Sequence, residues 1–130
     1  MYIRHKKAIT QPRLLEAQEG QLLAGHLLYL QRQGKISVYS HIPNETYTTS
    51  WNQKRKNRVQ GVRAGVPDYI IVIKDFVVFL ELKRQKGGVV SPEQREWLAA
   101  TDNKMTVSTV DKGFEDAKRF IDAILTRTTE

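Results

Sequence analysis

Residues 68–83 read DYIIVIKDFVVFLELK, and this stretch decides the fold. It holds two runs of β-branched and aromatic residues, 69–73 and 76–80, separated only by Lys74 and Asp75. Such runs predict two strands joined as a hairpin, although Lys-Asp is a weaker turn pair than Asn-Gly. Because both runs are apolar on both faces, we expect the strands to lie centrally in a sheet that is covered on both sides.

The turn of this hairpin determines which residues face each other. If it is symmetric about Lys74 and Asp75, residue 73 faces residue 76, and Asp68 stands directly opposite Glu81. Their β-carbons would lie about 5 Å apart, where two like charges destabilise a sheet unless something compensates them. Lys83 shares the face of Glu81, because side chains alternate with a period of two. A one-residue asymmetry in the turn would move the two acids to opposite faces.

Two carboxylates and an ammonium at one end of two strands suit phosphodiester hydrolysis. Asp68 and Glu81 carry the hard oxygen ligands that Mg²⁺ or Mn²⁺ prefers. Such a metal acidifies a bound water and clamps phosphate oxygens, while Lys83 orients the nucleophile or offsets developing negative charge. Taken singly, these residues also have an ordinary explanation. Asp68 follows Pro67 in a turn, and the other two are solvated residues at a strand end.

The elements around the hairpin follow from periodicity and capping signals. Leucines at spacings of three and four predict an amphipathic helix from Leu14 to about Gln33. Ser91-Pro92-Glu93-Gln94 is typical of a helix start with a capping box. The predicted fold class is α/β, a mixed central sheet flanked by helices in the order αβββαβα. The other predicted elements are a strand over 36–41, an irregular segment over 43–66, a helix to about Thr101, a strand through 105–109 and a last helix that begins at Asp111.

Composition restricts the class of protein further. The 130 residues, 40% of them hydrophobic, are enough for one domain over residues 1–130. The chain has no cysteine, which excludes disulfides and thiolate zinc sites. No stretch resembles a secretory signal or approaches a membrane span, so we expect a soluble cytoplasmic protein that makes no membrane contact. No Walker loop, Gly-x-Ser-x-Gly or dinucleotide fingerprint supports ATP use, serine hydrolysis or hydride transfer.

The net charge of +7 is unevenly distributed along the chain. Residues 1–90 hold 15 Lys and Arg against 6 acids, whereas residues 91–130 hold 6 against 8, which indicates one face that meets a polyanion. The basic segment 54–63 is an ordinary solvated loop by itself, but beside a phosphodiester-cutting site it predicts a DNA clamp. Tyr47 and Trp51 would stack on unpaired bases or anchor this loop. The candidate DNA-binding residues are Lys54, Arg55, Lys56, Arg58, Arg63, Arg84 and Lys86.

Residues 61–97, GVRAGVPDYIIVIKDFVVFLELKRQKGGVVSPEQREW, resemble the VRR-NUC (virus-type replication-repair nuclease) branch of the PD-(D/E)XK nuclease superfamily. The resemblance rests on a Gly-Val-Pro-Asp step, a Glu-x-Lys strand, a Gly-rich turn and a Ser-Pro-Glu-Gln helix start. The upstream stretch His41-Ile42-Pro43-Asn44 is also similar to the stand-alone, phage-type members. His41 and Asn44 would approach the substrate, although turn formation explains Asn44 equally well. The resemblance implies a PD-(D/E)XK, restriction-endonuclease-like core.

The resemblance also implies roles for the residues that match its motifs. Asp68 and Glu81 would be the metal ligands, and Lys83 the catalytic lysine. Gln94 would be the fourth motif residue, which reaches the site from its helix. The capping box with Ser91 explains Gln94 equally well, and both roles would be compatible at different moments.

The family further places an acid on its first helix. Glu19 and Glu16 are the candidates here. We favour Glu19, although Gly20 follows it and the match is loose.

The function implied by the resemblance is structure-selective endonuclease activity, dependent on Mg²⁺ or Mn²⁺, on branched DNA such as Holliday junctions or flaps. The implied context is replication, repair or recombination in a bacterial or phage-infected cell, with the enzyme acting as a homodimer. A catalytically silent DNA-binding accessory module is the alternative; it predicts substitutions in the site, whereas Asp68, Glu81 and Lys83 are all present. RNA as substrate is a third hypothesis. Contacts with the 2′-hydroxyl would distinguish RNA from DNA, and the sequence does not identify the residues that make them.

Overall fold

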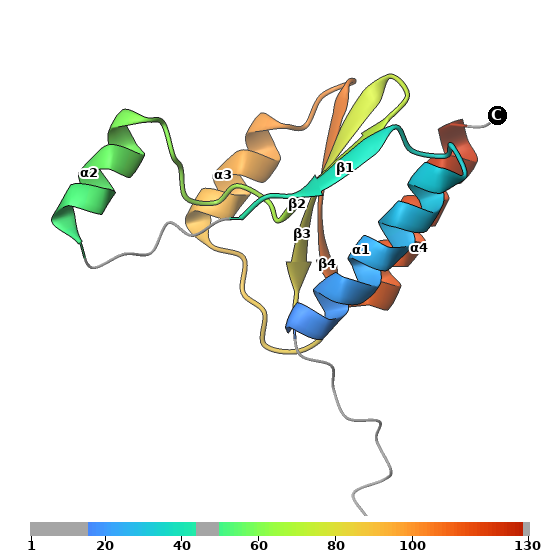
Figure 1. The fold of residues 1–130 in the computed structure, drawn as a ribbon, viewed down its shortest axis with the longest axis horizontal. Coiled ribbons are helices and arrows are strands. Elements are labelled where there is room, and N and C mark those ends of the chain that lie inside the picture. The colour runs from blue at the N-terminus through green and yellow to red at the C-terminus, as the bar shows by residue number, and fades with distance from the viewer. Residues whose placement is uncertain (1–15, 44–49, 129–130) are drawn as a thin grey trace, which may run out of the picture.

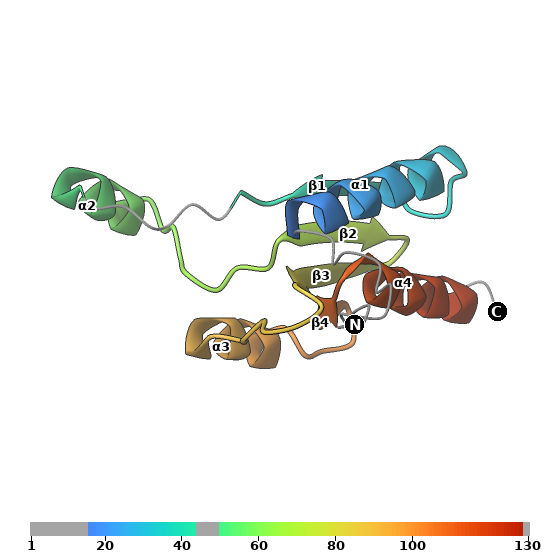
Figure 2. The ribbon, with the colours of Figure 1, turned by 90° about the horizontal axis from the view of Figure 1, so that it is seen from below.

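A computed structural model of the chain describes residues 16–43 and 50–128. Four strands form one sheet in the order β1-β2-β3-β4, in which β3 and β4 are parallel and the other pairs antiparallel. Figures 1 and 2 show α1 and α4 packed side by side, with α3 at the other side of the sheet and α2 set apart. The predicted fold class, a mixed α/β sheet flanked by helices, is confirmed. The elements are α1 (Glu16–Arg32), β1 (Val38–His41), α2 (Trp51–Val59), β2 (Tyr69–Ile73), β3 (Phe76–Lys83), α3 (Pro92–Ala100), β4 (Thr106–Lys112) and α4 (Phe114–Thr128).

The β2–β3 hairpin has the predicted register. Tyr69 pairs with Leu80 and Ile73 with Phe76, as a symmetric two-residue turn requires. The turn places Lys74 in the left-handed region, at φ 48°. That conformation costs a non-glycine residue about 1–2 kcal/mol. Burial of the strand side chains offsets this cost, because each fully buried aliphatic side chain contributes about 1.5–3 kcal/mol.

The core lies between the sheet and the pair α1 and α4. Ile71 and Leu80, on neighbouring central strands, are fully buried there, together with Leu23 and Leu27 of α1. These two leucines are four residues apart, so they lie on one face of the helix. Ile121 of α4 closes the same cluster.

The other face of the sheet is covered less completely. Trp97 of α3 packs edge-to-face on Phe79 of β3, with ring centroids 5.4 Å apart. Phe79, Ile70 and Val72 are nevertheless only half-buried. Helices therefore lie on both faces of the sheet, as expected, but α3 covers its face less completely than α1 and α4 cover the other.

Three other predictions about the elements need correction. Segment 43–66, predicted to be irregular, contains α2, so the observed order has a second helix after the first strand. Asp111, predicted to begin the last helix, is a buried residue of β4, because parallel pairing with β3 continues to the pair Lys83 and Lys112. β1 begins at Val38, two residues later than predicted.

Several sequence predictions fall outside the described residues, among them Leu14, Asn44 and Tyr47. Within residues 16–43 and 50–128, none of the helices has the length and apolar character needed to span a bilayer.

Candidate active site

Asp68 lies immediately before β2, where three chain segments meet. Its Oδ2 accepts a hydrogen bond of 3.0 Å from the backbone N–H of Leu82, which ties the side chain to β3. Its carbonyl oxygen accepts from the backbone N–H of Ile42 at 2.6 Å, and Nδ1 of His41 lies 2.9 Å from the same oxygen. The end of β1 and the end of β3 thus hold Asp68 from both sides.

Gly65 allows the segment before Asp68 to pass against the start of α3. Its φ is +85°, and a Cβ atom there would lie 2.4 Å from the carbonyl carbon of Glu93 and 2.8 Å from the backbone nitrogen of Gln94. No other residue fits without displacing that backbone, so the Gly-Val-Pro-Asp step needs glycine for both conformation and space. This close approach fixes Asp68 and Gln94 at the same corner of the molecule.

Glu81 of β3 is buried, at 6% exposed. Its Oε1 accepts a hydrogen bond of 2.6 Å from Nε2 of Gln94 and lies 3.3 Å from Nζ of Lys83. Its Oε2 is buried and has no hydrogen-bond partner among the residues that the structure describes. A buried carboxylate oxygen without a partner is costly, and a cation bound there would relieve that cost.

The electrostatics of the site follow from two acids that share one partly buried corner. Burial, and next the nearby Asp68 carboxylate, raise the pKa of Glu81 from 4.5 to about 7, against the opposing effect of Lys83. Burial also raises the pKa of Asp68 above its ordinary value. Two neighbouring carboxylates with raised pKa values resist ionising together, and a divalent cation would stabilise both charged forms.

The donor set fits Mg²⁺ or Mn²⁺. Both are hard cations, and Mg²⁺ usually takes one or two protein carboxylates and keeps several waters. Among the described residues, no group of three or more His, Cys, Asp or Glu side chains could hold a metal. A metal at this corner would therefore be held by Asp68 and Glu81, with water or phosphate oxygens as the remaining ligands.

Gln94 makes both of the contacts considered for it, and makes them at once. Its Oε1 accepts from the backbone N–H of Ser91 at 2.9 Å, and its own N–H donates to Ser91 Oγ at 3.1 Å, which completes the capping box. Its Nε2 donates to Glu81 at the same time. The start of α3 therefore orients the Glu81 carboxylate.

Lys83 is held along its aliphatic stem by the glycine-rich loop that follows β3. A Cβ atom on Gly88 would lie 2.8 Å from Cβ of Lys83 and within 3.4 Å of Cγ and Cδ. Gly88 therefore lets the loop cross directly over the lysine. The contact leaves the ammonium beside Glu81 rather than in open solvent.

The two acids of the first helix have different surroundings. Glu19 is buried, and its carboxylate accepts hydrogen bonds from Nε2 of Gln85 at 2.9 Å and from the backbone N–H of Phe114. The second contact places an acid at the N-terminus of α4, where the helix dipole favours negative charge. Glu16 instead borders a cleft of about 520 Å³ that Asp68 also lines. The structure thus brings Glu16, and not the favoured Glu19, to the Asp68 cleft.

The predicted DNA-binding residues are exposed and fall into three places. Arg63 forms an ion pair of 3.6 Å with Glu96 on α3, a contact that contributes little to stability because both side chains are solvated. Arg84 and Lys86 lie on the loop directly after Lys83. The other four are on α2: Lys54, Arg55, Lys56 and Arg58.

Sequence reasoning missed α2 although the chain carries a signal for it. Ser50 and Gln53 repeat the Ser-x-x-Gln spacing found at 91–94, and Ser50 Oγ accepts from the backbone N–H of Gln53 at 3.3 Å. The segment lacks apolar periodicity, so only this cap could have indicated a helix. No local pattern marks Gln85 or the Leu82 amide, since both act through contacts distant in sequence.

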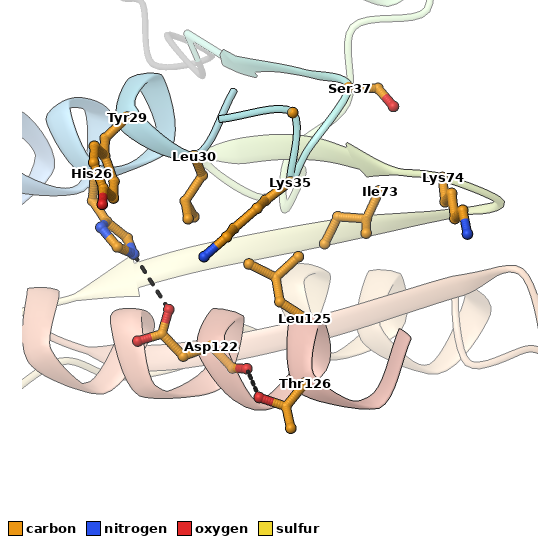
Figure 3. A pocket seen from close by; sticks show the side chains of 11 residues that line it. His26, Tyr29, Leu30, Lys35, Ser37, Ile73, Lys74, Asp122, Leu125 and Thr126 are labelled. Carbon is orange, nitrogen blue, oxygen red and sulfur yellow. Dashed lines mark hydrogen bonds and ion pairs between the residues drawn. The ribbon is translucent and has the colours of Figure 1, made fainter. Parts of the chain in front are cut away.

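A larger hollow, of about 810 Å³, lies at the opposite end of the hairpin, between α1, the β2–β3 turn and α4 (Figure 3). His26 Nε2 lies 3.5 Å from Asp122 Oδ1 in it, and the Asp122 side chain is 50% exposed. Lys35 and Lys74 also line this hollow. It shares no residue with the Asp68, Glu81 and Lys83 corner.

A solved structure named "VRR_NUC domain protein" has a similar fold. The TM-score is 0.59 with 21% sequence identity, over 81% of this chain and 85% of that chain. No family model matches the sequence, and no curated protein matches it. The likeness to the solved structure shows that this chain has a VRR-NUC-like fold.

Proposed function

We propose that this chain is a metal-dependent, structure-selective endonuclease that hydrolyses phosphodiester bonds in branched DNA, such as Holliday junctions or flaps, during replication, repair or recombination. The observation that carries this proposal is the buried Glu81 Oε2, which has no hydrogen-bond partner among the described residues although it lies near Asp68 and Lys83. The VRR-NUC-like fold supports nuclease activity. The basic α2 and the basic loop after Lys83 support a nucleic acid as substrate.

In this proposal Asp68 and Glu81 would hold Mg²⁺ or Mn²⁺, which when bound would supply Lewis-acid polarisation of the phosphate and lower the pKa of a water. The Leu82 amide and Gln94 keep the two carboxylates in position. Lys83 places a positive charge beside the scissile phosphate, where it offsets the charge that develops on the phosphate oxygens. Because the corner is partly buried, this electrostatic stabilisation is stronger than it would be in water.

A homodimer belongs to the same proposal. Two copies related by a twofold axis would present two equivalent sites to the two strands of a symmetric junction.

The test incubates purified protein with labelled four-way, flap and linear DNA duplexes in Mg²⁺, Mn²⁺ or EDTA. The parent should cut branched substrates only with metal, and Glu81→Ala and Lys83→Ala should each cut about 10²–10³-fold more slowly. Asp122→Ala is the matched control, because it removes an acid from the far hollow and should cut like the parent. Mg²⁺ should also raise the melting temperature of the parent but not of Glu81→Ala.

Four outcomes would count against the proposal. If no substrate is cut with metal, or if Glu81→Ala cuts as well as the parent, the enzyme proposal fails. Tight DNA binding without cutting would favour the accessory-module hypothesis. If matched RNA is cut faster than DNA, RNA would take the place of DNA as the proposed substrate.

A further inference from the structure

Helix α2 is the most exposed of the helices that the structure describes. None of its nine residues is buried, and every one except Asn57 is exposed. Trp51 at its start is 79% exposed, although tryptophan normally contributes a large buried area. The alternative that Trp51 anchors this segment to the fold is therefore not supported.

A short helix with no buried side chain is expected to have low stability by itself. Isolated helices shorter than about 12–15 residues are marginal in water, because nucleation is costly and stability in proteins comes mainly from packing. Contacts within α2 include the Ser50 cap, a hydrogen bond of 2.7 Å from Gln53 Nε2 to Asn57 Oδ1, and the Lys54 ammonium beside the Trp51 ring. We therefore expect a partner outside the sheet to supply further stabilisation.

The chemistry of α2 indicates what that partner is. Four of its residues are Lys or Arg, and residues 46–67 contain no acid. Lys54 Nζ lies 5.5 Å from the centre of the Trp51 ring, so a cation flanks an exposed aromatic face. Grooves that bind single-stranded nucleic acid combine these two elements, cations for phosphates and aromatic rings for bases. α2 lacks the apolar face of a membrane helix, since its apolar residues are Trp51 and Val59 alone.

We propose that α2 is a DNA-binding arm that becomes fully helical on its substrate, with Trp51 stacked on an unpaired base and the four cations on neighbouring phosphates. This proposal rests on the proposed function, because it takes DNA as the substrate. It deepens that function by naming unpaired bases as the feature that α2 recognises. Stacking tolerates any base, so the arm selects substrate shape rather than sequence.

The length of the connection limits where the arm can act. From Arg58 to Asp68 the chain advances ten residues, which can span at most about 36 Å. This is close to one turn of B-form DNA, about 34–36 Å. Because Gly65 is fixed against α3, this length keeps the backbone of Arg58 within about one turn of DNA from Asp68.

Amide hydrogen exchange tests the ordering of α2 directly. In EDTA, to prevent cutting, the amides of residues 54–60 should exchange rapidly in the free protein and at least about tenfold more slowly with a flap substrate. Amides of α3 serve as the internal control and should be protected in both states. Rapid exchange of 54–60 that the flap leaves unchanged would overturn the proposal.

Tryptophan fluorescence tests the stacking contact, because the chain has only two tryptophans. In Trp97→Phe, Trp51 is the sole reporter; its emission should be quenched by flap and single-stranded DNA and changed little by blunt duplex. In Trp51→Phe, the remaining Trp97 should respond equally weakly to all three. Equal quenching of Trp51 by blunt duplex and flap would refute the proposal that Trp51 recognises unpaired bases.

Charge replacement tests the phosphate contacts. Replacing Lys54, Arg55, Lys56 and Arg58 by Gln should lower the slope of log affinity against log salt by about 3–4. Replacing Lys104, Lys118, Arg119 and Arg127 by Gln removes the same charge elsewhere and should leave the slope nearly unchanged. Equal slopes for the two variants would overturn the phosphate contacts.

The outcomes separate this inference from the proposed function. Cutting that depends on Glu81, with α2 unprotected by DNA, would refute the arm and keep the nuclease. Protection of α2 by DNA without any cutting would keep the arm and refute the nuclease. Protection that rises with protein concentration alone would assign α2 to a second copy of the chain, and protection by anionic vesicles but not DNA would assign it to a lipid surface.

Discussion

Helices α2 and α3 have the same length and the same kind of N-terminal cap, but their contacts with the rest of the molecule differ. Each has nine residues, an N-cap serine and a glutamine three residues later. In α3, Gln94 turns back to the cap and across to Glu81. In α2, Gln53 turns forward to Asn57 instead. One local signal therefore starts both helices, and their surroundings decide what the glutamine does.

The difference shows what a start signal can and cannot determine. The cap predicts that a helix begins, because it satisfies backbone N–H groups that no helical carbonyl reaches. Whether the helix packs depends on side chains farther along, where α3 places Trp97 on Phe79 and α2 places four cations in solvent. α3 therefore belongs to the cooperative fold, and we expect α2 to contribute little to it.

The largest expected effect on stability comes from replacing Gly65, which lies against α3, and is compared with replacing Gly61, which follows α2. Gly65→Ala should destabilise the protein by about 2–5 kcal/mol, because it adds left-handed strain to a clash with the start of α3. Gly61, just after α2, also has positive φ but open space around it, so Gly61→Ala should cost at most about 1–2 kcal/mol. Urea denaturation measures both values. Equal losses would mean that the approach of Gly65 to α3 is not tight.

The next effect concerns Glu81, the buried acid to which Gln94 of α3 donates a hydrogen bond. The pKa of Glu81 is raised in the folded state to about 7, so between pH 4.5 and 7 the folded protein binds a proton that the unfolded chain has released. The free energy of unfolding should therefore fall as pH rises through this window, by on the order of 3 kcal/mol, and the loss is complete above pH 7. Denaturation in EDTA from pH 4 to 8 measures it.

The Glu81 contribution is isolated by comparison with Glu81→Gln, whose pH dependence should be flatter. Asp68 and Asp111, whose pKa values are also raised, act in the same direction in both proteins. Mg²⁺ should restore stability to the parent above pH 7. A parent and variant with parallel curves would show that Glu81 does not titrate in this window.

A third prediction separates the two glutamines by function. Gln94→Ala should slow metal-dependent cutting by about 10–100-fold, the usual cost of losing a residue that positions a metal ligand. Gln53→Ala should leave single-turnover cutting by the saturated complex nearly unchanged. Single-turnover kinetics at saturating protein measures both rates. A slower step in Gln53→Ala than in Gln94→Ala would reverse the assignment of the two helices.

The smallest effect compares the caps themselves. Ser91→Ala should cost about 1 kcal/mol of global stability, because α3 unfolds with the sheet. Ser50→Ala should change the global value by less than about 0.5 kcal/mol, because α2 opens locally without exposing core. Equal losses would show that α2 is part of the cooperative unit.

Local patterns were sufficient for the part of the molecule that carries the proposed chemistry. Alternation and turn length depend on neighbouring residues, so they predicted the hairpin register of Tyr69 with Leu80 correctly. Patterns could not rank Glu19 against Glu16, because the burial of Glu19 depends on contacts with Phe114 and Gln85, far along the chain. They missed α2 because hydrophobic periodicity does not reveal a helix that has no apolar face.

The Lys74-Asp75 turn is distant from the candidate active site, and yet the length of the turn sets the alignment of the two acids. One inserted residue there would keep both strands but move Asp68 out of register with Glu81. Such an insertion would make an inactive protein with every proposed catalytic side chain still present. In evolution, chains that keep this pair of acids should tolerate many substitutions at residues 74 and 75 and almost no change in their number.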